Sequence, residues 1–420
     1  MSYNYLSIIR ERFIVTNPRQ VGLVSGAHGM NEFFSLAIPP LLPLIINDLG
    51  IQYTQAGLLV SIYFVMYAIF QLPAGIVADK TDQYVLIIGG TLLMAGGMLA
   101  ASLAPTYGTV LLAVAVSGLG GSTYHPAGMS VISDIETDTT VGKAMGIHEF
   151  VGLGGNLLAP VTLGGLAAVF GWRSALGASS IVGILFAIIL ALSGVGTPGA
   201  ARKSSLSIGS TISTRRHQIR KNGFATFTGQ YLVSIKAHFA WWVVSLFLLK
   251  FLFTLQSYGV RTYLTAYVVS RTSLTISVAN TPFVAFLVGS AVATLIFGTL
   301  SDRINPHLLL ATTFLIAAIG IAATTVVPVS LVILIVWFFV VGTLVYAALP
   351  VVNTLTSHYS DEENSGSLFG IIQTASALGG VISPLVFGAI ATQYGISLAF
   401  PAVAAVGMIA STGIVVQYMI

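Results

Sequence analysis

The stretch Gly75-Ile76-Val77-Ala78-Asp79-Lys80 occurs a second time, in altered form, as Gly298-Thr299-Leu300-Ser301-Asp302-Arg303. Further glycines and prolines recur at an offset of 223 or 224 positions: Gly118 and Gly342, Pro126 and Pro350, Gly155 and Gly379, Pro160 and Pro384, Gly164 and Gly388, Gly171 and Gly395. A nearly constant offset across three regions predicts two copies of one membrane unit in the same order. Parallel repeats of this kind build transporters whose site lies between the halves.

The composition places the chain in a lipid bilayer. Of 420 residues, 55% are hydrophobic and 7% are charged, whereas soluble domains carry about 25% charged residues. So much apolar surface cannot be hidden from water within one chain. Cysteine is absent, which excludes disulfides and thiolate metal sites.

The positive charges indicate which side of the bilayer each loop occupies. Lys and Arg gather in the N-terminal segment, in the loop after Lys80, at Lys143, between Arg202 and Lys236, and at Arg303. These segments fall on one side when spans are counted from the start, so the positive-inside rule predicts that both termini are cytoplasmic. The net charge of +4 therefore reflects topology, and we expect no nucleic-acid partner. Met1 to Gln20 lacks the apolar core of a signal peptide.

Because a crossing helix needs about 20 mostly apolar residues, the sequence predicts an all-α membrane protein of twelve spans. We place them near 21–46, 54–78, 84–104, 107–130, 142–168, 173–195, 238–268, 278–300, 306–327, 329–356, 365–391 and 396–418. This divides the chain into a six-helix half at 1–195, a basic cytoplasmic linker at 196–236 and a second six-helix half at 237–420.

Prolines and glycines mark two of the spans. Pro39, Pro40 and Pro43 lie in the outer half of span one, where they should bend the helix and free carbonyls that protein or water must satisfy. This bend is predicted to face the interior, where it can gate; a purely structural bend is the alternative. Span five is rich in glycine, and close helix packing is the preferred interpretation there, ahead of direct contact with substrate.

The repeated stretch resembles motif A of the major facilitator superfamily, with one copy after span two and one after span eight. The resemblance implies that superfamily's twelve-helix fold and a gating role for Asp79, Lys80, Asp302 and Arg303. These residues would hold the halves together on the cytoplasmic side in the outward-open state. The sequence departs from the motif after each Asp, with Asp82-Gln83-Tyr84 and Asn305-Pro306-His307.

Two further stretches resemble the fosmidomycin-resistance branch, whose members are proton-driven exporters. They are Tyr124-His125-Pro126-Ala127 at the end of span four, and the run from Gly146 to Arg173 in and after span five. The second stretch also resembles the antiporter motif C, although Ala159 replaces its glycine. The resemblance implies export, and it does not specify a substrate.

Charged groups inside a membrane are expensive and therefore indicate function. His28, Asn31 and Glu32 in span one have the spacing of one helix face, and His125, His148 and Glu149 lie in spans four and five. A poorly solvated carboxylate and a histidine can both exchange protons near neutral pH. We predict that Glu32 with His28 carries the coupling proton, and that Glu149 with His148 or His125 is the second choice. Hydrogen bonds that merely tie helices together, or a divalent metal site, are the alternatives.

Span seven supplies candidates for substrate binding. Lys250 lies near its middle and Arg261 toward its outer end, with Gln256 and Tyr258 between them. Together with Asn31 and Tyr346, these residues are predicted to contact substrate. Lys250 would face the Glu32 cluster or an anionic group, with a structural ion pair as the alternative. Arg261 near a helix end could instead extend to the interface.

The titratable groups do not follow the repeat. At an offset of 224, Glu32 corresponds to Gln256, Glu149 to Gln373, His125 to Leu349 and His148 to Ile372. The repeat is therefore predicted to supply the moving frame, with proton chemistry confined to the first half.

These observations favour a secondary transporter that exports a small organic solute by alternating access coupled to protons. Uptake of an organic anion, transport of a metal ion or chelate, and a non-transporting sensor or assembly factor are the alternatives. We expect no enzyme, no cofactor and no bound structural metal. The expected partners are a small solute, protons and lipid, with a functional monomer in the cell membrane, the inner one in a Gram-negative bacterium.

Overall fold

The computed structural model describes residues 15–78, 80–137, 139–194, 241–301, 303–358 and 365–419. Every regular element in these ranges is helical. The N-terminal bundle consists of α2 (Pro18–Ser35), η1 (Pro39–Leu41), α3 (Leu42–Leu49), α4 (Tyr53–Ala78), α5 (Gln83–Leu103), α6 (Tyr107–Gly121), α7 (Tyr124–Ile135) and α8 (Val141–Leu192). The C-terminal bundle consists of α12 (Trp241–Arg271), α13 (Ile276–Ala279), α14 (Thr281–Ser301), α15 (Pro306–Ala323), α16 (Leu331–Tyr346), α17 (Ala348–His358), α18 (Ser365–Tyr394) and α19 (Ile396–Met419). The predicted linker, Asp79 and Asp302 lie outside the described residues.

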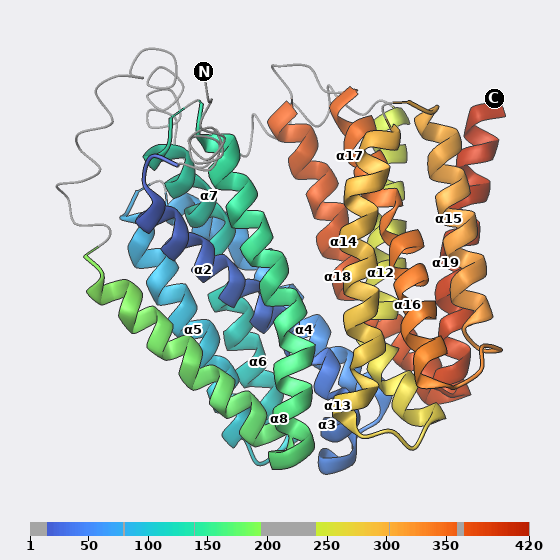
Figure 1. The fold of residues 1–420 in the computed structure, drawn as a ribbon, viewed down its shortest axis with the longest axis horizontal. Coiled ribbons are helices and arrows are strands. Elements are labelled where there is room, and N and C mark those ends of the chain that lie inside the picture. Colours follow the sequence, from blue (N-terminus) through green and yellow to red (C-terminus); the bar gives the residue numbers. More distant parts are fainter. Residues whose placement is uncertain are drawn as a thin grey trace, which may run out of the picture.

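The two bundles form a V (Figure 1). The start of α2 and the end of α19 lie at the same end of the molecule, which we call the termini end, and there the bundles diverge. They meet at the opposite end, the far end, where α4 contacts α18 and α8 contacts α13 and α14. The arrangement is closed at the far end and splayed at the termini end.

Ten helical segments among the described residues are long and apolar enough to cross a bilayer. One of them, α8, consists of two arms that run in opposite directions on either side of Gly171 (Figure 1). The pair α6–α7 adds a further long segment that is interrupted only at residues 122 and 123. The count of twelve crossings stays a prediction, for which these features supply the needed segments.

The sequence repeat reappears as repeated packing. A side chain at Gly118 would lie 2.3 Å from the carbonyl oxygen of Tyr63, and one at Gly342 would lie 2.1 Å from that of Phe286. These glycines therefore let α6 approach α4, and α16 approach α14, closely enough for backbones to touch. Gly171 and Gly395 recur in the same way as turn residues, with φ of 80° and 89°, a region that glycine enters without strain.

Prolines break the first span, as the sequence predicts. α2 ends at Ser35, and a short 3₁₀ turn from Pro39 precedes α3. The carbonyl of Pro40 accepts a hydrogen bond of 3.3 Å from the side-chain amide of Asn280 in the C-terminal bundle. The bend thus faces the other bundle, and one of its backbone carbonyls accepts a hydrogen bond across the interface between the bundles.

Arg173 lies at the far end, opposite the predicted cytoplasmic charges, and is neutralised there. Its guanidinium lies 3.1 Å from the carboxylate of Asp48 and 4.3 Å from the ring centre of Trp172. Trp172 also donates to Asp48 at 3.1 Å. This cluster joins the turn at Gly171 to the end of α3, so the charge serves local structure there.

Glu136, just after α7, caps the start of α2 from another segment. Its two carboxylate oxygens accept the backbone N–H groups of Thr16 and Asn17, each at 2.8 Å, and Asn17 itself makes no side-chain cap. A negative charge is favourable at a helix N-terminus. Burial alone would raise the pKa of Glu136, but hydrogen bonds from Thr140 and from the two N–H groups outweigh it and lower that pKa.

We expect Glu136→Gln to destabilise the folded chain by about 1–2 kcal/mol at neutral pH, since a capping charge is lost. Because the pKa is lower in the folded state, the stabilisation is complete above the unfolded pKa and is lost as pH falls through the folded one. The melting temperatures of parent and variant in detergent should therefore differ at neutral pH and converge as the pH falls through the lowered folded-state pKa of Glu136. A difference that persists in acid would contradict the assignment of the stabilising charge to Glu136.

Candidate functional site

Glu32 lies between two imidazole rings that reach it from α2 and α7. Its Oε1 atom is 3.6 Å from Nε2 of His28 and 3.6 Å from Nε2 of His125. The His28 side chain is only 4% exposed, whereas Glu32 is 23% exposed. The structure therefore brings together these three predicted residues, with the carboxylate reachable and His28 enclosed.

Hydrogen bonds fix the tautomer of His28. Its Nδ1 atom lies 2.9 Å from the carbonyl oxygen of His148, and because a carbonyl only accepts, Nδ1 carries the hydrogen. In the neutral ring, Nε2 then directs its lone pair toward the carboxylate of Glu32. An ionised carboxylate beside that lone pair is unfavourable without a proton, so the pair is arranged to share one.

His148 is fixed in the same way through Tyr124. The Tyr124 hydroxyl donates to the carbonyl of Val24 at 2.6 Å, so its contact of 2.9 Å with Nε2 of His148 has the imidazole as donor. Nδ1 of His148 faces the Glu149 carboxylate at 3.4 Å and makes no hydrogen bond among the described residues. The rings of His28 and His148 stack with centres 4.0 Å apart. Glu149 is 68% exposed, so a proton bound there is less shielded from water than one bound to Glu32.

Glycines in α8 make room for this cluster. A side chain at Gly152 would lie 2.4 Å from the His28 ring, and one at Gly155 would lie 2.0 Å from the carbonyl of Gly29. These two positions let α2 and α8 cross closely, as the packing interpretation of the glycine-rich span predicts, whereas Gly154 and Gly165 have open space around them.

Asn156 of α8 connects Glu32 to the other bundle. Its Nδ2 donates to Oε2 of Glu32 at 2.7 Å, and its Oδ1 accepts from Nη2 of Arg261 at 3.4 Å. Arg261 also donates to the Tyr346 hydroxyl at 3.2 Å and lies 5.1 Å from the ring centre of Tyr258. Arg261 thus lies at the centre of the molecule and does not extend to the interface between membrane and water.

Sequence reasoning did not single out Asn156 as a functional residue. A usable signal was present, because Asn156 follows Glu149 by seven residues and His148 by eight. Two helical turns place residues of that spacing on one face of α8.

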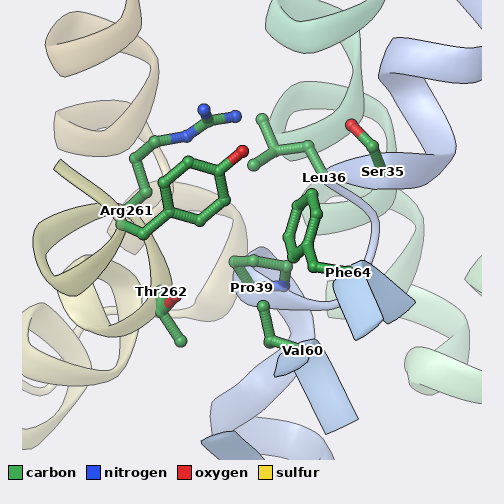
Figure 2. Close-up of a pocket in the computed structure, with 8 residues that line it drawn as sticks. Ser35, Leu36, Pro39, Val60, Phe64, Arg261 and Thr262 are labelled. Carbon is green, nitrogen blue, oxygen red and sulfur yellow. The ribbon is translucent and has the colours of Figure 1, made fainter. Parts of the chain in front are cut away.

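A pocket lies between the bundles beside Arg261. Its lining consists of Ser35, Leu36, Pro39, Val60, Phe64, Tyr258, Arg261 and Thr262. Figure 2 shows Arg261 and Thr262 on one side, with Pro39, Val60 and Phe64 facing them from the N-terminal bundle. The lining is mainly apolar and aromatic with one cation, but the empty volume of about 200 Å³ is smaller than that of a typical site for a small organic ligand, about 300–1,000 Å³.

The far end is held closed by hydrogen bonds between the bundles. Thr54 contacts Thr392 through both its N–H, at 2.9 Å, and its hydroxyl, at 3.0 Å. Ser61 donates to the carbonyl of Val381 at 2.7 Å. The Tyr263 hydroxyl of α12 contacts the carbonyl of Tyr53 of α4 at 3.2 Å. The close approach involves backbone as well as side chains, so it requires small residues at the contact.

Comparison with known proteins gives the family. The model of the Major Facilitator Superfamily matches residues 23–274 and 246–419. These ranges span both bundles, the cluster around Glu32 and the pocket. The chain belongs to the Major Facilitator Superfamily. It is therefore a multi-pass protein of the cell membrane and a secondary transporter that works by alternating access between the two bundles.

Proteins of similar sequence are named as multidrug resistance proteins. Multidrug resistance protein MdtG of Enterobacter lignolyticus (strain SCF1) is 28% identical over 383 residues, which cover 87% of this chain and 84% of that protein. The protein of the same name from Citrobacter koseri is 27% identical over 381 residues, covering 87% and 86%.

Solved structures share the fold. A bacterial homologue of the human lysosomal transporter Spinster, in an inward-facing and unoccupied conformation, superposes with a TM-score of 0.81 at 18% identity, over 95% of this chain and 96% of that one. The peptide transporter POT in complex with sulfate gives a TM-score of 0.74 at 15% identity, over 95% and 94%.

Three predicted substrate residues of this superfamily member are buried and do not line the pocket. Asn31 is buried and donates to the carbonyl of Gly121 in α6 at 2.8 Å. Gln256 is fully buried, with neither amide atom hydrogen-bonded among the described residues. Lys250 is buried and donates to Asn353 at 3.4 Å, so its contact is with α17 of its own bundle.

The predicted gating charges are described in part. Lys80 and Arg303 are exposed at the termini end, and their role in gating stays a prediction.

Two sets of side chains in the transporter each place three ligand atoms within 4.8 Å of one another, as a divalent metal would need: His28, Glu32 and His125, and His28, His148 and Glu149.

Proposed function

We propose that this transporter exports a small organic solute in exchange for protons, with Glu32, His28 and His125 as the proton site. The observation that carries the proposal is the carboxylate held 3.6 Å from two imidazole Nε2 atoms. One added proton is stabilised by three groups there, and the 23% exposure of Glu32 leaves a route for it to arrive. Histidine titrates near neutral pH.

Export of a drug-like solute is supported by the side chains that line the pocket and by the relatives. The lining offers Leu36, Val60 and Phe64 for apolar contact and Tyr258 for stacking. The curated relatives are named multidrug resistance proteins. The stretches in spans four and five that resemble the fosmidomycin-resistance branch support the same direction. With both termini in the cytoplasm, the splayed termini end corresponds to an inward-open state.

The experiment begins with a thermal-shift screen of a solute library, since a ligand that binds the folded state raises its apparent stability. A hit is then used as the probe in proteoliposomes with an imposed pH gradient. In exchange for protons the probe accumulates on the acidic side, whichever way the protein is inserted, and a protonophore abolishes the accumulation. Accumulation on the alkaline side would show co-transport with protons, and accumulation without a gradient effect would exclude proton coupling.

Arg261 supports a second candidate, the transport of an organic anion. Its Nε atom is buried and makes no hydrogen bond among the described residues, although guanidinium groups pair readily with carboxylates. The screen distinguishes this candidate through matched pairs of a carboxylate and its methyl ester. Equal stabilisation by both members of each pair would exclude an anion site.

A further inference from the structure

Asn156 makes two hydrogen bonds of opposite polarity to groups of opposite charge. Its amide N–H points to the carboxylate of Glu32, 2.7 Å away, and its amide oxygen points to the guanidinium of Arg261, 3.4 Å away. A flipped amide would place oxygen against oxygen and N–H against N–H. The charges on both sides therefore fix the orientation of this amide.

The two partners belong to different bundles. Glu32 lies on α2 and Arg261 on α12, while Asn156 lies on α8. The hydrogen bonds of Thr54 and Ser61 at the far end also join the bundles, but they involve only neutral groups. The bond from Arg261 to Asn156 is therefore a link between the bundles whose strength depends on charge.

We propose that Asn156 is a positioning residue that transmits the protonation state of Glu32 to Arg261 and so to the opposite bundle. When Glu32 is ionised, its charge orients the amide, and the amide oxygen holds Arg261. When a proton from water binds Glu32, the charge-assisted bond from Asn156 becomes a weaker neutral one. The amide is then free to turn, Arg261 loses an acceptor, and the bundles are free to move relative to each other.

The inference rests on the proposed proton site. The charged and titratable groups around Glu32 therefore matter, because they affect the protonation of its carboxylate. Its own helix contributes His28. The helices packed against it contribute His125 and Tyr124 on α7, Tyr63 and Tyr67 on α4, His148 and Glu149 on α8, and Tyr258 and Arg261 on α12. Only Asn156 among the described residues hydrogen-bonds both to Glu32 and to a cation of the other bundle.

The test measures two properties of the full chain in nanodiscs. Because the chain has no native cysteine, spin labels at Ser133→Cys on α7 and Leu308→Cys on α15, both exposed, report the distance between the bundles. Infrared difference spectra report protonation of Glu32 as the carboxyl band that Glu32→Gln removes. Both are recorded from mildly alkaline to mildly acidic pH.

In the parent, acidification should change the ratio of the two distance populations at least about fivefold, the lower range of measured coupling between sites. Asn156→Leu should keep the carboxyl band but lose this distance response. Asn47→Leu, the same substitution at an exposed position of α3, should respond as the parent does. Asn156→Ala removes the same groups with less volume and replaces Asn156→Leu if that variant does not fold.

A parent-like distance response in Asn156→Leu or Asn156→Ala would overturn the relay and leave the proton site intact. A parent-like response in Glu32→Gln would overturn both, because Glu32 would then not be the group that senses pH. Loss of the carboxyl band in Asn156→Leu would also overturn the relay, since Asn156 would then serve proton binding itself.

Discussion

Gly57→Leu should hold the transporter open at the far end and reduce transport to background. A side chain at Gly57 would lie 2.1 Å from the carbonyl oxygen of Pro384 and 2.4 Å from the hydroxyl of Tyr263. The first neighbour is backbone of the opposite bundle, which cannot rotate away as a side chain can. The far end therefore cannot close over a leucine, whereas a state with separated bundles has room for it.

The size of the expected loss of transport follows from the equilibrium between the states with the far end closed and open. Overpacking a close contact costs about 1–3 kcal/mol or more, and here the cost falls on the closed far end alone. Such a difference shifts the population ratio of the two states by about 5- to 150-fold. Alternating access needs both states, so the transport rate should fall with the population of the closed one.

Labelling of a buried cysteine measures this shift. Ser61 is fully buried at the interface, beside Val381, and a Ser61→Cys background offers the only thiol in the chain. A membrane-impermeant maleimide should label it slowly in that background and at least about fivefold faster when Gly57→Leu is added.

Gly89→Leu on α5 is the matched control, because a side chain at Gly89 meets nothing within 4 Å. It should leave both labelling and transport unchanged. If Gly57→Leu abolishes transport but labelling stays slow in a protein of normal melting temperature, the far-end contact is not the gate.

Much of the fold was predictable because its physical causes are local or repeated. Apolar runs of the length of a bilayer predict the helices, and Pro39 and Pro40 predict the break in the first span. The pairing of Gly118 with Gly342 predicts a shared packing site, which the backbone contacts of α4 with α6 and of α14 with α16 confirm. These features depend on one helix or on one repeated pair.

The site was predictable only where helix geometry suffices. His28 and Glu32 differ by four residues, and their side chains meet. Asn31 shares that face only approximately, because consecutive helical residues differ by about 100° in direction. Its amide reaches Gly121 of α6 instead. Spacing alone could not show which neighbouring helix each side chain meets.

The bridge from Glu32 to Arg261 could not be read from the sequence. It depends on how two bundles lie against each other, and Asn156 and Arg261 are 105 positions apart. The sequence predicts Arg261 near a helix end, whereas α12 extends to Arg271. Ten further residues put the guanidinium about 15 Å from that end. This is too deep for it to extend to the interface between membrane and water.

Glu32→Gln should abolish accumulation driven by a pH gradient while leaving the site able to bind ligand. The carboxamide keeps an oxygen that can accept from Nδ2 of Asn156, as Oε2 does now, but it takes up no proton near neutral pH. It therefore resembles the protonated carboxyl at every pH. In an exchanger, proton and substrate favour opposite states, so ligand affinity in the parent should fall on acidification by about 5- to 150-fold, the usual range of coupling between two sites.

The variant should bind the ligand with one affinity at all pH values, equal to that of the acidified parent. Isothermal titration at two pH values measures this, and proteoliposomes measure driven accumulation. Glu149→Gln is the informative comparison, because that carboxylate is 68% exposed and His148 is the ion-pair partner that the described part of the chain gives it. It should retain both the pH dependence of binding and most of the driven accumulation.

The opposite pattern would assign the proton site to Glu149 on α8 in place of Glu32 on α2. If Glu149→Gln makes binding independent of pH and Glu32→Gln does not, the proton binds at Glu149 and His148, where Nδ1 has no other partner among the described residues. His28 touches both arrangements, through its ring nitrogen Nε2 toward Glu32 and through Nδ1 to the carbonyl of His148. Loss of pH dependence in both variants would mean that one proton is shared along this path, because each carboxylate would then be needed to hold it.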